Sequence, residues 1–554
     1  MPSDPPRICR RLILLLDGTW NEDDDEQPAT NIVYLRERLF WGLQTRLRNQ
    51  EERPALPESH ERRATSGFVF DGFEYIVYYD RGVGTGPLFD RITGGVTGKG
   101  LDHNIRKAYR FLSQWFRPGD EIFVFGFSRG AFTARSLCGY LQAVGLLHAE
   151  ACNADNEMRA WNFYRTAPAD RLSADWLYFR QSSGGTPLIH NENEMRVRAL
   201  AVFDTVGALG VPAVGFRKIN RSKYEFHDTD VNSLVDIRLH ALAIDESRVA
   251  FEPTPWTKPK FKLIDQDRSP TEQVWFAGAH ADIGGGYVKW NKHEHGLSHL
   301  PLTWMIQRLQ YHLANTPPLA ALPRAEEVVQ PQRNAPIPFF TDDLLSPPDG
   351  AEHIAMTKLV QDLSFSVQHK PWAFLKGSLE ACRIINQLPL PKDIKMKAVG
   401  LVPHSDPIGE MIHVSALRRI RSDTPIVVDE GRALGVVNKT LSLLRPPKRS
   451  DSHYLPPNLT GVMPYIAATY LRKHGAATNT QWKQLFDRFL LSWKEIRIVD
   501  WDGRPLDPDV KEDVVRAFEL LPTPEAVQVS NMPSEMESHL VPMAGHMPGV
   551  DRVL

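Results

Sequence analysis

Short apolar runs that end in a glycine or an aspartate constrain this chain more than any other feature. Residues 12–16 are entirely apolar and are followed by Asp17 and Gly18, and residues 122–125 and 197–203 follow a similar pattern. Runs of this length suit strands that are buried on both faces, as in parallel sheets. Segments with helical spacing separate the runs, so the sequence predicts an α/β fold with a mostly parallel sheet flanked by helices. The predicted strands are 12–16, 73–79, 122–125, 197–203 and 274–276, and the predicted helices are 31–47, 101–116, 131–144 and 300–313.

The alternation of strands and helices stops after about residue 315. We therefore predict a first domain, which holds the α/β fold, over residues 1–315, followed by a proline-rich, less regular insertion or lid-like subdomain over 316–460. Residues 461–554 are predicted to form a C-terminal helical region with a loosely ordered tail. An aromatic stripe over 481–493, which includes Trp482 and Trp493, either packs in the core or docks peripherally on a lipid surface.

The balance of charges and the apolar runs narrow the class of protein. Lys and Arg number 65 against 67 Asp and Glu, so a basic surface for nucleic acid is not expected. The apolar run near the N-terminus is too short for a signal peptide, and no run reaches the 18 residues of a membrane span. We expect a protein made in the cytoplasm, so that any export would use a route independent of a signal peptide.

The strongest local motif is the G-x-S-x-G sequence at residues 126–130, which follows a predicted strand and opens a predicted helix. A sharp turn there raises the hydroxyl of Ser128 out of the sheet, and the two glycines leave room for the turn. Backbone N–H groups at the start of the helix point toward charge that develops beside the serine. The pattern predicts that Ser128 is a nucleophile, and the alternative is a tight turn with a buried serine.

A serine nucleophile needs a base, and the base needs an acid that orients it. Asp204 ends one predicted strand and His280 lies just beyond another, in the order Ser, Asp, His. Carboxyl ends of parallel strands meet at one edge of a sheet, so the three side chains are expected to converge. Asp17 competes with Asp204 as the acid, and Asp282 and Asp245 are the next candidates.

Backbone donors for a developing oxyanion are predicted at two places. The N–H of Arg129 follows the nucleophile directly, and the loop after the first strand supplies a second donor from Gly18 or Thr19. This chemistry requires neither a metal nor an organic cofactor.

Four further patterns are not interpreted as nucleotide, metal or disulfide sites. The glycine-rich stretch 94–100 lacks the spacing of a phosphate-binding loop, and the stretch 82–86 is not followed by a dinucleotide-binding helix. His293, His295 and His299 form a cluster without a carboxylate or cysteine spaced to complete a metal site. The four scattered cysteines form no C-x-x-C pair, so neither a disulfide scaffold nor a thiolate zinc site is expected.

Six segments in order resemble the catalytic domain of the type VI secretion phospholipase effectors, the Tle class with a GxSxG nucleophile. They are LDGTWN, GVGTG, GFSRGAFTAR, DTVG, HALAIDESR and GAHADIGGGY, between about residues 11 and 315. Uncharacterised bacterial and fungal proteins are similar. The resemblance implies an α/β-hydrolase-like fold and a phospholipase in which Ser128 is the nucleophile, with Asp204 and His280 as acid and base.

The expected substrate is therefore a lipid ester, cleaved through an acyl-enzyme. The alternatives are a soluble esterase for a non-lipid substrate, and a non-catalytic binding protein that keeps the hydrolase fold. The resemblance also implies a secretion or immunity partner, although the chain carries no obvious fused secretion adaptor.

Overall fold

The structure is a computed structural model of the 554-residue chain. The residues that it describes are 7–18, 29–47, 65–70, 72–82, 99–166, 188–190, 195–206, 233–246, 251, 253–256, 270–287, 296–317, 328–329, 337, 368–370, 408–421, 426–430, 448–452, 454, several positions between 459 and 470, and 496–521.

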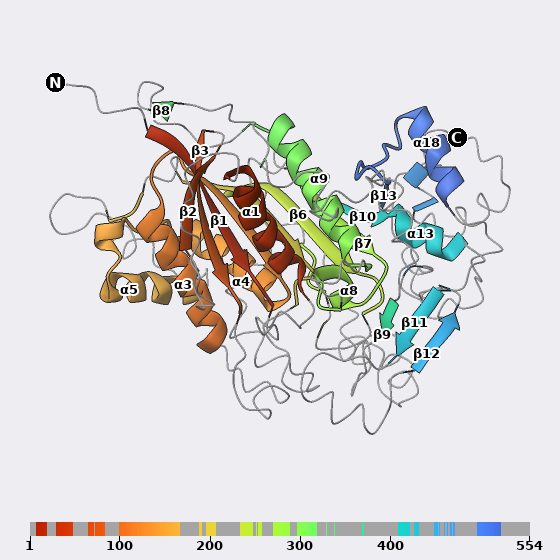
Figure 1. The fold of residues 1–554 in the computed structure, drawn as a ribbon, viewed down its shortest axis with the longest axis horizontal. Helices are drawn as coiled ribbons and strands as arrows, with labels where there is room; N and C mark the ends of the chain where they lie inside the picture. The colour runs from red at the N-terminus through yellow and green to blue at the C-terminus, as the bar shows by residue number, and fades with distance from the viewer. Residues whose placement is uncertain are drawn as a thin grey trace, which may run out of the picture.

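A mostly parallel sheet forms the centre of the protein (Figure 1). Its strands are β1 (Arg7–Leu16), β2 (Thr65–Phe70), β3 (Phe73–Asp80), β4 (Glu121–Phe127), β5 (Val197–Phe203), β6 (Val235–Ala243), β7 (Thr271–Phe276), β8 (Val328–Val329), β10 (Glu410–His413) and β13 (Arg497–Val499). The strand order is β13-β10-β7-β6-β5-β4-β1-β3-β2, and β8 pairs with the beginning of β1. Neighbouring strands run parallel except for β2 and β3, which are antiparallel.

Helices cover both faces of this sheet. On one face lie α1 (Asn31–Leu47), α8 (His280–Gly284) and α9 (His299–Asn315), and on the other lie α3 (Lys99–Trp115), α4 (Arg129–Val144) and α5 (Ala154–Arg165). In Figure 1, α1 and α9 cross the near face. Successive residues of β1 therefore enter two different cores, Ile13 on the α1 side and Leu14 on the α4 side, which explains why its run is apolar throughout.

The predicted α/β class is confirmed, and each element predicted within the first 315 residues appears within a few positions. The helix 31–47 and the strand 197–203 have the predicted bounds. The strand β6 was not predicted. Its polar residues alternate with apolar ones, yet it is buried along its whole length. Those polar side chains find partners: Asp236 accepts from Arg196 at 2.8 Å, and Arg238 donates to Thr271 at 3.1 Å.

The sheet continues into the C-terminal half of the chain. Strand β10 pairs with β7, and β13 pairs with β10, so both extend the same sheet beyond residue 315. Helices α13 (Val414–Arg421) and α18 (Lys511–Leu520) pack beside them, and β9 (Gln368–Lys370), β11 (Ile426–Glu430) and β12 (Lys448–Ser452) form a small separate sheet (Figure 1). The predicted domain boundaries at residues 315 and 460 stay predictions. The sheet contains strands from all three predicted regions, since β7 lies before residue 315, β10 between the two boundaries and β13 after residue 460.

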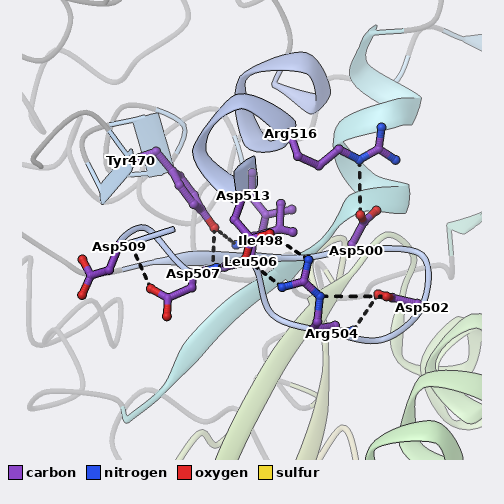
Figure 2. A network of polar contacts seen from close by, with 10 residues as sticks. All are labelled: Tyr470, Ile498, Asp500, Asp502, Arg504, Leu506, Asp507, Asp509, Asp513 and Arg516. Carbon is purple, nitrogen blue, oxygen red and sulfur yellow. Dashed lines mark hydrogen bonds and ion pairs between the residues drawn. The ribbon is translucent and has the colours of Figure 1, made fainter. Parts of the chain in front are cut away.

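Polar contacts fix the last described segment, as Figure 2 shows. Arg504 makes two bonds to Asp513, at 2.7 and 2.8 Å, and the Tyr470 hydroxyl accepts from the Ile498 N–H at 2.9 Å. Residues 481–493, with the aromatic stripe, and the tail after 521 lie outside the described residues. Among the helices that are described, none is long and apolar enough to cross a membrane.

The strand order changes direction at one point in the sheet. From β1 the chain goes to β3 on one side, and it then returns to β4 on the other side of β1. Ligand sites of open α/β sheets lie beyond the carboxyl ends of the strands at such a switch point. The elbow serine follows β4, so it lies at this point.

Candidate active site

The elbow at Ser128 has the strained geometry that its sequence predicts. Ser128 joins β4 to α4 with φ 59°, in the left-handed region that non-glycine residues rarely adopt. A Cβ on Gly130 would lie 2.1 Å from the carbonyl oxygen of Leu16, and one on Gly126 would lie 2.7 Å from the Cα of Ala131. The glycines therefore let the helix start close against β1 and β4, which leaves the serine at the edge of the sheet.

Three side chains from the ends of different strands form one hydrogen-bonded series. The His280 Nε2 atom lies 2.8 Å from the Oγ of Ser128, and its Nδ1 atom lies 2.6 Å from Oδ2 of Asp204. All three side chains are buried. A carboxylate can only accept, so the Nδ1 nitrogen carries the proton and Nε2 is left to accept from the serine hydroxyl.

Asp204 is fixed from its other side. Its Oδ1 atom accepts from the N–H of Ala243 at 3.0 Å, and its own N–H donates to the carbonyl of Ala241 at 2.7 Å. Like Ser128, Asp204 has a positive φ, of 38°, and these are the only two such non-glycine residues in the described part of the chain. Strained backbone of this kind concentrates at functional sites.

Two aromatic rings hold the imidazole of His280. Its centroid lies 4.7 Å from that of Phe127 and 5.0 Å from that of Phe251. His280 is 4 % exposed, so its bonds to serine and aspartate are shielded from water. Neither ring was among the predicted site residues, although Phe127 is part of the elbow motif.

The other carboxylates proposed as the acid have different partners. The Oδ2 atom of Asp17 accepts from Thr30 at 2.8 Å and from Tyr79 at 3.1 Å, so this residue organises the loop after β1. Asp282 accepts from the N–H of Ala279 at 3.1 Å. Asp245 accepts from the N–H of Gly278 at 2.6 Å.

The predicted oxyanion donors differ in their surroundings. The N–H of Arg129, at the start of α4, meets no acceptor among the described residues. Gly18 lies against the elbow, because a Cβ on it would come within 3.2 Å of the Ser128 Cβ. Its N–H, however, donates to Asp17 Oδ1 at 2.7 Å. Thr19 lies outside the described residues.

The remaining sequence patterns contribute little here. His299 is buried at the start of α9, where its Nδ1 accepts from the N–H of Gly296 at 3.1 Å and its ring contacts Tyr34. His293, His295 and the glycine-rich stretch 94–98 lie outside the described residues. Within the described ranges, no three His, Cys, Asp or Glu side chains gather as a metal site would require.

The protein is thus an α/β protein that carries serine, histidine and aspartate in hydrogen-bonded contact at the carboxyl edge of its sheet. The family model for the catalytic domain of Tle1-like phospholipase effectors of the type VI secretion system (T6SS) matches residues 10–308. This is more than half of the chain, and the chain belongs to that family.

Each match with a similar protein covers only part of this chain and only part of that protein. An uncharacterized protein of the yeast Saccharomyces cerevisiae is 27% identical over 282 residues, which are 47% of this chain and 36% of the yeast protein. A solved structure of the Tle1 effector bound to the VgrG spike of the type VI secretion system is 21% identical, with a TM-score of 0.26, and covers 51% of this chain and 52% of its own. An uncharacterized protein from Pseudomonas aeruginosa is 14% identical, with a TM-score of 0.29, and covers 92% of this chain and 66% of its own.

Proposed function

We propose that the protein is a serine hydrolase that cleaves the ester bond of a phospholipid through an acyl-enzyme. The observation that carries this proposal is the series of contacts from Ser128 through His280 to Asp204, at 2.8 and 2.6 Å. These are the contacts that a serine nucleophile, its general base and the acid that orients the base need.

In the proposed reaction, Ser128 Oγ bonds to the ester carbonyl carbon as His280 Nε2 takes the hydroxyl proton. Asp204 stabilises the imidazolium that forms. The carbonyl π electrons move to the oxygen, which becomes an oxyanion and accepts from the Arg129 N–H. When the oxyanion collapses, the bond to the alcohol breaks and the alcohol leaves with the proton from His280. Water then attacks the acyl-serine by the same steps, which releases the fatty acid and restores Ser128.

The second oxyanion donor is proposed from the loop after β1. The Gly18 N–H already donates to the Asp17 carboxylate. It can act as an oxyanion donor only if it leaves that carboxylate and donates to the substrate oxygen instead. Thr19 is the alternative. The Arg129 N–H needs no such exchange.

The side chain of Arg129 supports a substrate that carries negative charge. It follows the nucleophile directly, and burial lowers its pKa to about 10. No carboxylate in the described part of the chain pairs with it. Arg129 is partly buried, and an anionic ligand supplies the counter-charge that a partly desolvated cation lacks. A phospholipid supplies a phosphate near its ester bonds. The positive charge of Arg129, together with the family, favours phospholipid over a neutral ester.

Delivery and membrane contact are also proposals. The family description refers to type VI secretion, and this supports a partner from such a system or an immunity protein. Action on a membrane requires contact with the lipid surface, and we propose that the aromatic stripe 481–493 makes this contact. We also propose that the protein is made in the cytoplasm and exported without a signal peptide.

The test combines a fluorophosphonate probe, which labels activated serines, with hydrolysis of phospholipid vesicles. We expect the wild-type protein to be labelled and to release fatty acid, and Ser128→Ala to lose both. Ser136→Ala, a control at a buried serine of the same helix, should keep both. Labelling that persists in folded Ser128→Ala contradicts the nucleophile. Hydrolysis of short soluble esters without hydrolysis of vesicles favours the soluble esterase, and absence of both favours the binding protein.

A further inference from the structure

Two acidic residues after β6 hold the backbone that carries His280. Asp245 makes two bonds to Gly278: its Oδ2 accepts from the Gly278 N–H at 2.6 Å, and its N–H donates to the Gly278 carbonyl at 3.0 Å. The next residue, Glu246, accepts from the N–H of His280 itself at 3.2 Å. Residues 245 and 246 therefore hold the backbone from Gly278 to His280.

A tyrosine from the far end of the chain completes this anchor. The hydroxyl of Tyr454 donates to Oδ2 of Asp245 at 3.0 Å, across 209 positions of sequence. The guanidinium of Arg419, on α13, lies 4.9 Å from the centre of the Tyr454 ring. Both side chains are buried. They lie beyond residues 10–308, which match the family, so the C-terminal half of this chain reaches the backbone beside the site.

We propose that Tyr454 is a positioning residue, which holds the Asp245 carboxylate in place and thereby fixes the 278–280 backbone that aims His280 at Ser128. This proposal rests on the proposed function for its effect on turnover, but not for its effect on the loop. A shift of the His280 backbone changes both imidazole contacts together, because the ring bonds to Ser128 on one side and Asp204 on the other.

The charge of Asp245 gives the anchor a dependence on pH. Burial raises the pKa of Asp245 to about 6, although the Gly278 N–H, Arg419 and the Tyr454 hydroxyl each lower it. Asp282 also faces it and raises its pKa. As pH falls through about 6, the carboxylate gains a proton and becomes a weaker acceptor, so the loop loosens. Removing the Tyr454 hydroxyl raises the pKa of Asp245 further, and the loosening then begins at higher pH.

The experiment compares Tyr454→Phe with Tyr470→Phe in the full-length chain. Tyr470 is the matched control, since it is a buried tyrosine of the C-terminal half whose hydroxyl bonds to Ile498 and Leu506 (Figure 2) and not to the 278–280 loop. For each protein, kcat and KM on a short soluble ester are measured from pH 5 to pH 9. Hydrogen exchange of the peptide spanning residues 271–287 is measured in parallel.

We expect Tyr454→Phe to lower kcat about three- to tenfold at pH 7 with little change in KM. The acid limb of its pH profile should move up by roughly half to one pH unit, because one hydrogen bond to the carboxylate is lost. The 271–287 peptide, which contains the N–H groups of Gly278 and His280, should include amides that exchange about three- to tenfold faster. Adding Tyr454→Phe to Asp245→Asn should move the acid limb no further, and Tyr470→Phe should not move it.

The proposal is overturned if Tyr454→Phe has the same acid limb and the same exchange rates as the wild-type protein. An equal shift in Tyr470→Phe also overturns it, because this would indicate general loosening of the C-terminal half. If the wild-type protein hydrolyses no ester but the 278–280 loop exchanges faster in Tyr454→Phe alone, the anchor stands and the proposed function fails.

Discussion

The contact between Asp204 and His280 leads to a prediction about which carboxylate acts as the acid. Asn in place of Asp204 keeps the shape but offers a donor toward Nδ1, which favours the wrong imidazole tautomer. We expect Asp204→Asn to lower kcat on an ester by roughly 10⁴-fold, with the fold unchanged by circular dichroism. Asp17→Asn, the control, should lose less than about tenfold, since Asp17 bonds to Thr30 and Tyr79. Near-normal turnover by Asp204→Asn would exclude this residue as the acid.

The sequence predicted which side chains meet at the edge of the sheet better than it predicted what surrounds them. Ser128, Asp204 and His280 each follow a strand, and chain order alone brings them to one edge of a parallel sheet. Tyr454 could not be found in this way, because its bond to Asp245 depends on how two halves of the chain pack. The acceptor of the Gly18 N–H was equally hidden, since it depends on the rotamer of Asp17.

The close packing of strand and helix at the elbow depends on Gly130, because glycine has no side chain. A Cβ on Gly130 meets the backbone carbonyl of Leu16 at 2.1 Å, and backbone of a central strand cannot move aside as a flexible side chain can. We expect Gly130→Ala to destabilise the protein by about 3 kcal/mol or more and to abolish fluorophosphonate labelling, measured by urea unfolding and probe incorporation. Gln142→Ala, on the exposed side of the same helix, should change stability by less than about 0.5 kcal/mol. Normal stability of Gly130→Ala would contradict this close packing.

Strand β6 shows why one central element escaped prediction while its neighbours did not. The strands β1 and β5 read as apolar runs because both faces of the sheet are covered. In β6, Asp236, Arg238 and His240 interrupt the run, although each is buried. Their partners, such as Gln273 at 3.2 Å from His240, come from other segments. A buried polar residue with a distant partner has the same local sequence as an exposed one, so periodicity alone cannot separate them.

The alternation of strands and helices in the sequence predicts a domain boundary near residue 315. In the structure, however, the segments before and after this residue pack into one shared core. Apolar residues of the C-terminal half, among them Leu417, Ile466 and Ile498, are fully buried in the core that covers the α9 face. Side chains of β7 also reach across, since Gln273 donates to the carbonyl of Ile408 at 2.7 Å and Trp275 donates to Glu410 at 3.1 Å. The first 315 residues contain the proposed catalytic groups but not the whole core around them.

A fragment of residues 1–317 should therefore fail to fold, although it contains Ser128, Asp204 and His280. Removing β10 exposes the edge of β7, and removing the C-terminal half exposes a large apolar surface, and both promote aggregation. We expect the fragment to be insoluble or unfolded and not to react with fluorophosphonate, as judged by size-exclusion chromatography, circular dichroism and labelling. A fragment of residues 1–521 keeps every described element and should fold and label like the full chain. A soluble, monomeric 1–317 fragment that labels at the full-length rate would show that the catalytic half is a self-sufficient domain.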